Sequence, residues 1–225
     1  MKTSPVRKSA WLVLLIVLAL AQSACNYATQ FISGISTQKS GALQPASCDN
    51  KYLPAKAGAT WTFGLGNTQI SESYTISHVT PTSFQEDVEN TPLKYSIFWS
   101  CTSSGLVYPG TDNNNMFTDG TGVTIPASIN AGDQWTQTYS SKTDTYAISY
   151  KALGEESITV PAGTFTAMKI QKISVIKGIG SQSAINEDAF EWWAAGIGTV
   201  KKSTTYKSNT NTFGLDYVLQ SYHLP

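Results

Sequence analysis

Short runs in which apolar and polar residues alternate recur along the chain from about residue 48 to the C-terminus. One run places Leu93, Tyr95, Ile97, Trp99 and Cys101 on one face of an extended strand, with mostly polar residues between them. Successive side chains of a strand point to opposite faces, so this pattern is typical of a half-buried sheet. Tyr, Ile, Val, Thr and Ser dominate the runs, as the pleated surface of a sheet prefers.

Turn-forming sequences such as Gly64-Leu65-Gly66-Asn67 and Asp119-Gly120 separate these runs. Short strands joined by such turns predict antiparallel pairing. The chain of 225 residues is long enough for one domain with a sizeable core. We therefore expect a single all-β domain over residues 48–225, in which antiparallel twisted sheets form a sandwich or a half-barrel.

One stretch, residues 186–196, also carries helix signals. Asn186 is a suitable helix cap, acidic residues follow it, and Gly196 is a suitable helix end. The aromatic residues Phe190, Trp192 and Trp193 fit a strand better. We favour the strand and keep the helix as the alternative.

The first 24 residues have the layout of a secretory signal peptide. Lys2, Arg7 and Lys8 form a basic start, and an unbroken apolar run extends from Ala10 to Ala21. As a helix these twelve residues would span roughly 18 Å, short of the ~30 Å hydrocarbon core of a bilayer. A transmembrane anchor is therefore the weaker alternative to a signal that is removed.

Cys25 follows the small pair Ser23-Ala24. This resembles the lipobox of bacterial lipoproteins, whose cysteine is diacylated and becomes the new N-terminus, although Gln22 departs from the Leu-like residue that the pattern prefers. We expect Cys25 to be the lipidation site that attaches the chain to a membrane of the cell envelope, with residues 25–47 forming the lipidated cysteine and a flexible tether. Ordinary cleavage after Ala21, which would give a secreted protein, is the alternative.

The charge balance argues against a nucleic-acid partner. The fifteen basic and fifteen acidic residues cancel in the whole chain, and removal of residues 1–24 leaves twelve basic against fifteen acidic residues. Arg7 is the only arginine, so the mature chain lacks the planar fork that binds phosphate in two places. Nucleic-acid binding requires a basic surplus that this chain does not have.

Two cysteines, Cys48 and Cys101, remain beyond the lipidation site. Exported proteins meet an oxidising compartment, so we expect a Cys48–Cys101 disulfide. Two unpaired thiols are the alternative. A metal site is less favoured, because isolated cysteines lack the paired spacing of zinc ligands.

A short internal repeat links two parts of the chain. The pattern A-G-x-x-W-T occurs at residues 57–62 and 131–136, and each copy is followed by Tyr-x-Ile-Ser, at residues 74–77 and 146–149. We interpret these segments, near 54–77 and 126–149, as two related β-units that share one core.

Two further motifs carry a family resemblance. They are V-P-A-G-T-F at residues 160–165 and W-W-A-A-G-I-G-T-V-K at residues 192–201. Together with A-G-x-x-W-T, they resemble bacterial envelope lipoproteins and secreted proteins that contain a β-rich domain of unknown function, over residues 50–225. The resemblance implies an antiparallel twisted sheet curled into a sandwich or half-barrel, and it supplies no catalytic residues.

The chain shows no catalytic motif and no cofactor motif. No G-x-S-x-G sequence occurs, and His78 and His223 are the only histidines. We interpret three groups of acidic residues as solvated charges of turns and edges: Glu86, Asp87 and Glu89; Glu155 and Glu156; Glu187, Asp188 and Glu191. The Asn-rich stretch around Asp112 resembles a calcium loop, but Met116 occupies a ligand position, so we expect a plain turn and no metal or cofactor.

The adjacent residues Trp192 and Trp193 are the candidate ligand-binding residues. Neighbours on a strand point to opposite faces, so we expect one of them to be exposed. The sequence thus favours a non-catalytic lipoprotein that binds or scaffolds an envelope protein, lipid or glycan. A carrier of a hydrophobic ligand or lipid is one alternative, and a glycan hydrolase that uses Glu187, Asp188 or Glu191 is another.

Overall fold

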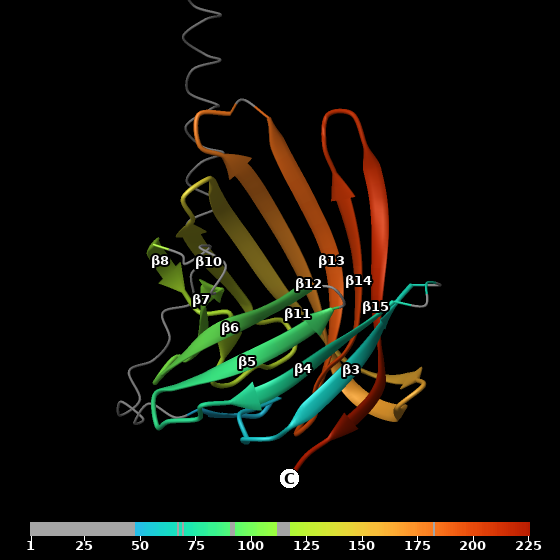
Figure 1. The fold of residues 1–225 in the computed structure, drawn as a ribbon. Coiled ribbons are helices and arrows are strands. Elements are labelled where there is room, and N and C mark those ends of the chain that lie inside the picture. Colours follow the sequence, from blue (N-terminus) through green and yellow to red (C-terminus); the bar gives the residue numbers. More distant parts are fainter. Residues whose placement is uncertain (1–47, 67, 69, 91–92, 112–117, 182) are drawn as a thin grey trace, which may run out of the picture. The chain divides into compact units, whose positions relative to one another are not determined.

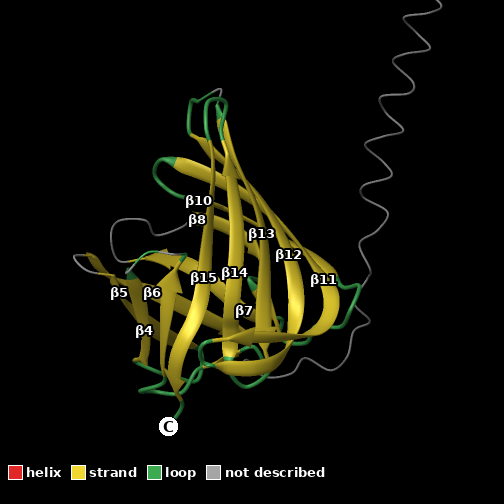
Figure 2. Ribbon diagram, turned by 90° about the vertical axis from the view of Figure 1, so that its right-hand side faces the viewer, coloured by secondary structure: helices red, strands yellow, loops and turns green. Residues whose placement is uncertain are grey.

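The computed structural model describes residues 48–225 except residues 67, 69, 91–92, 112–117 and 182. Within these residues all of the regular secondary structure is β-strand, as the alternating pattern predicts (Figures 1 and 2). No helix in this part of the chain has the length and apolar character that crossing a bilayer requires. The predicted signal peptide, Cys25 and the predicted tether lie outside the described residues.

Two antiparallel sheets are present in the described part of the chain. The small one pairs β1 (Asp49–Asn50) with β2 (Leu53–Pro54). The large one has thirteen strands, in the spatial order β8-β10-β11-β12-β13-β14-β15-β3-β4-β5-β6-β7-β9. Its strands are β3 (Thr60–Leu65), β4 (Ser71–Ser77), β5 (Ser83–Asn90), β6 (Leu93–Thr102), β7 (Gly105–Thr111), β8 (Thr118–Gly122), β9 (Ile125–Pro126), β10 (Gln134–Ser140), β11 (Asp144–Val160), β12 (Gly163–Gly178), β13 (Ala184–Ala194), β14 (Gly198–Lys207) and β15 (Thr212–His223).

The large sheet folds back on itself. Strand β15 pairs with β3, which joins the C-terminal and N-terminal halves of the domain into one continuous surface. In Figure 1, β3 to β6 run across the direction of β11 to β15, and the two groups enclose a concave face. The outermost strands, β8 and β9, do not pair with each other, so the sheet does not close into a barrel. The predicted antiparallel all-β fold is confirmed, and it takes the form of an open half-barrel.

Irregular pairing bends the long strands. The register shifts between Ala152 and Gly154 in β11, between Leu219 and Ser221 in β15, and in β14 between Thr199 and Lys201, opposite Trp193 and Trp192 of β13. Such bulges bend a strand and increase its twist. A flat sheet of this width would leave one face without a core, whereas the bent sheet buries its concave face against itself.

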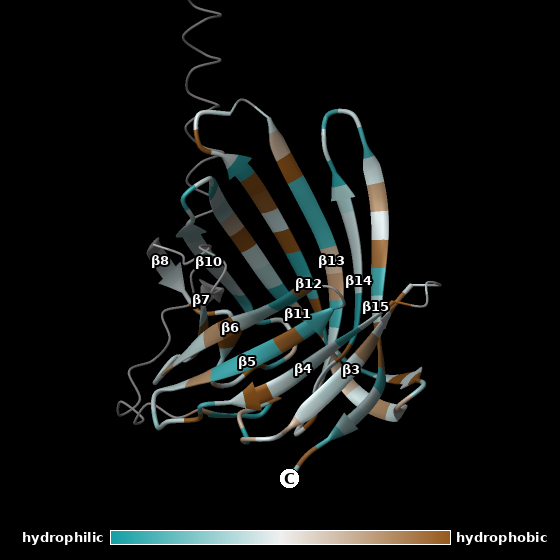
Figure 3. Ribbon diagram, viewed as in Figure 1, coloured by the Kyte–Doolittle hydropathy of each residue, from teal (hydrophilic) through white to brown (hydrophobic). Residues whose placement is uncertain are grey.

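Apolar side chains from both halves of the sheet form one core. Phe84 and Ile76 from the N-terminal strands, and Ile170 and Leu219 from the C-terminal strands, are almost fully buried. Figure 3 shows that apolar positions alternate with polar ones along several strands. Trp61 on β3 also donates its indole N–H to the carbonyl oxygen of Ile197, 2.7 Å away, and so ties β3 to the turn between β13 and β14.

The stretch with helix signals is a strand. It forms β13, which pairs with β12 on one side and β14 on the other, so its backbone bonds are made with neighbouring strands. The strand interpretation is therefore confirmed. The Gly196 that suggested a helix end lies instead in the turn between β13 and β14, with a φ of 74°.

The two A-G-x-x-W-T segments form the same local structure. Gly58 and Gly132 both have positive φ values, 85° and 92°, which a glycine adopts without strain. The N–H of Gly58 donates to the carbonyl of Ile76 at 2.9 Å, and the N–H of Gly132 donates to the carbonyl of Ala152 at 2.8 Å. Each glycine turn thus leads into a hairpin that carries a tryptophan.

The second part of the repeat is shifted relative to the sequence alignment. Trp61 lies opposite Tyr74 across its hairpin, and Trp135 lies opposite Tyr150. Tyr146, which the alignment matched to Tyr74, lies opposite Tyr139 instead. By cross-strand partner, Tyr74 thus corresponds to Tyr150, whereas the Tyr-x-Ile-Ser similarity aligns it with Tyr146.

A disulfide joins Cys48, at the start of the described chain, to Cys101 on β6. Their Cα atoms are 5.1 Å apart, and the cysteines are 53 positions apart in the sequence. Both residues are buried. The bond attaches the first described residue to the interior of the large sheet.

Candidate functional site

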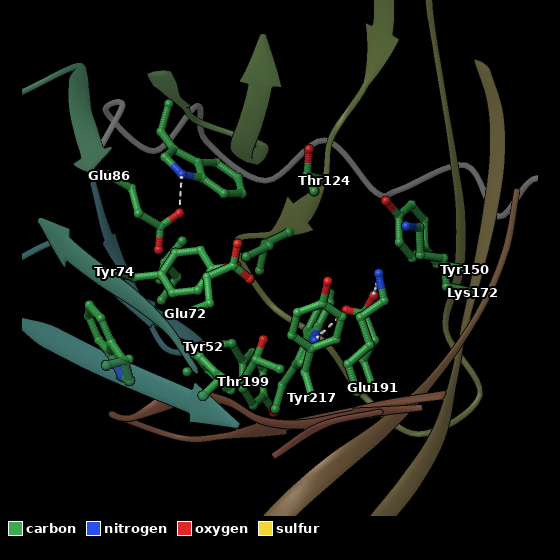
Figure 4. A pocket seen from close by; sticks show the side chains of 18 of the residues that line it. Tyr52, Glu72, Tyr74, Glu86, Thr124, Tyr150, Lys172, Glu191, Thr199 and Tyr217 are labelled. Atoms are coloured by element: carbon green, nitrogen blue, oxygen red, sulfur yellow. Dashed lines mark hydrogen bonds and ion pairs between the residues drawn. The ribbon is translucent and has the colours of Figure 1, made fainter. Parts of the chain in front are cut away.

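A cavity of about 330 Å³ opens on the concave face of the half-barrel (Figure 4). Its lining comes from β3 to β6 on one side and from β11 to β14 on the other, with further residues from β2, β9 and β15. A volume of this size lies within the range of small-molecule sites. The cavity therefore forms where the two halves of the bent sheet face each other.

Aromatic side chains make up much of the cavity wall. Trp61, Trp99 and Trp193 reach it from β3, β6 and β13. Trp99 stacks on the core residue Phe84 with ring centroids 5.8 Å apart, and Trp193 lies 6.2 Å from Trp135. These contacts with the core hold the rings in place, so the wall is already formed without a ligand.

Glu72 projects into the cavity from β4. It shares the inner face of that strand with Tyr74, whose hydroxyl donates to Glu72 Oε2 at 2.8 Å. The hydroxyl of Tyr95 on β6 donates to Glu72 Oε1 at 3.4 Å. Burial and then the Glu72 charge raise the pKa of Tyr74 well above its ordinary value, which keeps this hydroxyl protonated as a donor.

Glu86 on β5 is the second carboxylate on this wall. Its exposed fraction is 7%, and Oε2 accepts a hydrogen bond from the indole N–H of Trp99 at 3.1 Å. Burial raises the pKa of Glu86 to about 7, and the Trp99 bond only partly offsets that increase. Glu86 is thus a carboxylate whose ionised form lacks full compensation in the protein itself.

The opposite wall holds an ion cluster. Lys172 Nζ lies 2.9 Å from Glu187 Oε2, and Lys202 Nζ lies 3.1 Å from Glu187 Oε1. Ser174 donates to the same carboxylate at 2.8 Å. Burial alone would raise the pKa of Glu187, but the two lysine charges lower it to about 2. Glu187 therefore neutralises the two lysines that line the cavity.

The interpretation of the acidic residues as solvated charges is wrong for Glu86 and Glu187, both of which are buried. The sequence contained a signal for Glu86, because Phe84, Glu86 and Val88 alternate and so occupy one face of β5. Asp87 points to the other face, where Ser77 and Ser96 donate to it at 2.6 and 2.7 Å. Residues on the inner face of a strand cannot be called solvated from their charge alone.

The three acidic residues proposed for glycan hydrolysis, Glu187, Asp188 and Glu191, do not form a catalytic pair. Glu187 is held by two lysines and has a lowered pKa, so it cannot act as a general acid near neutral pH. Asp188 is exposed on the other face of β13. Glu191 lines the cavity, but it lies beside Lys202 and accepts from Trp193.

Trp192 and Trp193 do point to opposite faces, yet both are buried, at 8% and 3% exposed. The expectation that one of them is exposed is therefore wrong. Trp192 lies outside the cavity under the ammonium groups of Lys169 and Lys201, which are 5.0 and 5.2 Å from its ring centroid, and it donates to Glu156 at 2.6 Å. Of these two adjacent tryptophans, only Trp193 lines the cavity.

Metal ligands do not gather in the part of the chain that the structure describes, where no three His, Cys, Asp or Glu side chains are placed to hold an ion. The Asn-rich stretch around Asp112 falls in residues 112–117, outside the described residues.

The DUF3108-like family matches residues 111–216, which span β8 to β14 and the first residues of β15. No curated protein sequence matches the chain. Among solved structures, the chain is similar to a "putative lipoprotein" from Parabacteroides distasonis ATCC 8503, with 20% identity, a TM-score of 0.54 and coverage of 77% of this chain and 99% of that one. It is also similar to a "putative exported protein with YmcC-like fold" from Bacteroides fragilis NCTC 9343, with 14% identity, a TM-score of 0.55 and coverage of 78% and 100%. At these identities the similarity shows the fold, which is the one described as YmcC-like.

Proposed function

We propose that this chain is a membrane-anchored lipoprotein of the cell envelope, held by acylated Cys25, whose non-catalytic half-barrel binds a small ligand in its concave cavity. Residues 1–24 act as the signal peptide, and residues 25–47 connect the anchor to the domain. The domain, residues 48–225, carries the binding site.

The location rests on the N-terminal sequence. A basic start, a short apolar run and a cysteine after Ser23-Ala24 are the parts of a lipoprotein signal. The Cys48–Cys101 disulfide suits an oxidising compartment. The two structural relatives, described as a lipoprotein and as an exported protein, support the same location.

The binding role rests on one observation, the cavity of about 330 Å³ with aromatic walls and buried carboxylates. A domain that only scaffolds another protein has no need of such a cavity. Buried carboxylates disfavour a wholly apolar occupant, because an acyl chain would offer them no compensating partner. The cavity therefore favours a small ligand with both apolar and polar groups over a lipid tail.

The anchor is tested by the intact mass and the cell fraction of the protein. The wild-type chain should collect in the membrane fraction and carry the mass of acyl groups on Cys25. The Cys25→Ala variant should carry none. Wild-type protein that is soluble and begins after Ala21, with no added mass, would replace this proposal with the secreted alternative.

Ligand binding is tested with the mature chain, residues 25–225, purified from membranes and exchanged into lipid nanodiscs. Native mass spectrometry should detect a co-purified small molecule. Thr199 lines the cavity, so Thr199→Trp should fill part of it and remove that molecule. Thr210→Trp, at an exposed position, is the matched control and should retain it.

Circular dichroism must first establish that Thr199→Trp has the wild-type fold. Equal retention of the molecule by folded Thr199→Trp and by wild type would place binding elsewhere. Recovery of empty wild-type protein, with no uptake from an envelope extract, would count against a binding role.

A further inference from the structure

The charges that line the cavity are unbalanced. Within the described residues, the ion pairs on the domain include Glu187 with Lys172 and with Lys202, but none involves Glu72 or Glu86. The hydrogen-bond partners of these two carboxylates are neutral, namely the hydroxyls of Tyr74 and Tyr95 and the indole of Trp99. One wall of the cavity thus holds two carboxyl groups that no cationic side chain of the described residues pairs with.

The same wall is aromatic. Trp61, Phe63 and Tyr74 line the cavity together with the two carboxylates. Aromatic faces attract cations, and the attraction grows when water is excluded. Carboxylates and aromatic faces therefore favour the same kind of ligand group.

Tyr52 adds a buried polar group to the cavity wall. It lines the cavity, its side chain is 3% exposed, and its hydroxyl has no hydrogen-bond partner among the described residues. Lys51 lies over the ring, with Nζ 4.9 Å from the centroid, and its interaction with Tyr52 raises the pKa of Lys51. A buried hydroxyl without a partner is costly unless a ligand or water completes it.

The lysines of the opposite wall do not call for an anion. Lys172 and Lys202 share the Glu187 carboxylate, and Lys202 also lies 3.9 Å from Glu191. Their charges are compensated inside the protein. Glu72 and Glu86 are the carboxyl groups of the cavity that have no such counter-charge among the described residues.

We propose that the ligand of this cavity is an organic cation, an amine on a compact apolar body, whose ammonium group lies against Glu72 and Glu86. This inference rests on the proposed binding function and names the chemical class of its ligand. The apolar body packs on the tryptophans, and the ammonium donates hydrogen bonds to the carboxylates. Burial raises the pKa of Glu86 to about 7, and an ammonium group bound beside it would favour its ionised form.

Three test ligands with one body separate the charge from the shape: phenethylamine, 2-phenylethanol and phenylacetate. Isothermal titration calorimetry with the mature chain in zwitterionic nanodiscs, corrected with empty nanodiscs, gives the affinity for each. Phenethylamine should bind at least roughly tenfold more tightly than the alcohol, and phenylacetate should bind most weakly.

Variants then test the residues. Glu86→Gln and Glu72→Gln keep the shape of the side chain and remove its charge, so each should weaken phenethylamine binding roughly tenfold and leave 2-phenylethanol unchanged. Glu89→Gln is the control, because Glu89 lies on the same strand with an exposed side chain that pairs with Lys94. It should bind all three ligands as the wild type does.

The outcomes distinguish the two proposals. If phenylacetate binds more tightly than phenethylamine, or if 2-phenylethanol binds as tightly as phenethylamine, the cation inference is overturned. The cavity then remains a binding site. A co-purified molecule that is lost in Thr199→Trp and carries no basic nitrogen would do the same. Absence of binding by all three ligands, together with an empty wild-type protein, would overturn both.

Discussion

Glu86 and Glu187 are both buried, but their surroundings change their pKa values in opposite directions. Glu86 accepts a hydrogen bond from the neutral Trp99 indole, and burial raises its pKa to about 7. Glu187 faces the ammonium groups of Lys172 and Lys202, which lower its pKa to about 2 despite its burial. A buried carboxylate is stable as an anion only where the protein supplies opposite charge.

The Glu86 side chain should make the domain less stable as the pH rises. Its folded pKa of about 7 exceeds the ordinary value of 4.5, so between these values the folded state holds a proton that the unfolded state has lost. The free energy of unfolding should fall by about 3 kcal/mol from pH 4.5 to 7, at about 1.36 kcal/mol per pKa unit. Glu86→Gln should abolish this fall in urea denaturation curves. A wild-type stability that is flat across that interval would contradict the expectation.

Removal of the Glu187 charge should be strongly destabilising. Glu187→Gln leaves Lys172 and Lys202 buried without their main counter-charge, which should cost about 3–5 kcal/mol at pH 7. The control Glu89→Gln breaks an exposed pair with Lys94 and should cost less than about 1 kcal/mol. Chemical denaturation of both variants provides the comparison, and equal losses would show that the Glu187 cluster contributes no more than a surface pair.

The burial of single side chains was the property least predictable from the sequence. The alternation around Glu86 placed it on an apolar face, but its charge suggested solvent. The Trp192 ring is covered by Lys169, a residue of β12 that lies 23 positions earlier in the sequence. Contacts across strands decide such burial, and a pattern along one strand does not contain them.

At the scale of elements, only some of the turns were predictable, since Asp119-Gly120, which the sequence indicates as a turn, lies within β8. The V-P-A-G-T-F motif marks the turn where β11 ends at Val160 and β12 begins at Gly163, as its chemistry predicts. The lengths of 17 residues for β11 and 16 for β12 were not predicted. The bulge at Gly154 interrupts the alternation, so one long strand looks like two short ones.

A backbone contact at Gly105 should make β7 intolerant of a side chain. Gly105 has a φ of 138°, and a Cβ there would lie 2.2 Å from the carbonyl oxygen of Ile125 on β9. Gly105→Ala should therefore lower the free energy of unfolding by more than about 2 kcal/mol. Gly214→Ala is the control, since its Cβ would meet only Thr204 O at 3.6 Å, and its stability should stay within about 1 kcal/mol of wild type. Thermal unfolding followed by circular dichroism compares the two, and equal melting temperatures would contradict this view of the β7–β9 contact.

At the scale of the whole molecule, the sequence predicted the fold class but not the curvature of the large sheet. Alternating strands and turns specify an antiparallel all-β domain, and the same pattern fits a sandwich or a half-barrel. The bulges in β11, β14 and β15 and the pairing of β15 with β3 produce the open half-barrel. The cavity follows from this curvature, so its lining could not be identified before the two halves were placed face to face.

The disulfide should contribute substantially to the stability of the whole domain. It closes a loop across a sequence separation of 53, for which the chain-entropy model gives about 4 kcal/mol. A reducing agent should shift the urea midpoint of the wild type downward and leave the Cys48→Ala/Cys101→Ala variant unchanged. The reduced wild type and the double variant should unfold at similar midpoints, and a wild type insensitive to reduction would contradict this role.

The same bond determines how the domain bears mechanical load. Tension that arrives along the chain at Cys48 passes through the disulfide to Cys101 on β6, an interior strand of the large sheet. Strands β1 to β5 lie within the closed loop, so they cannot be peeled away one at a time by that pull. With the proposed N-terminal tether, the disulfide would carry the pull directly to β6 instead of to the first strand.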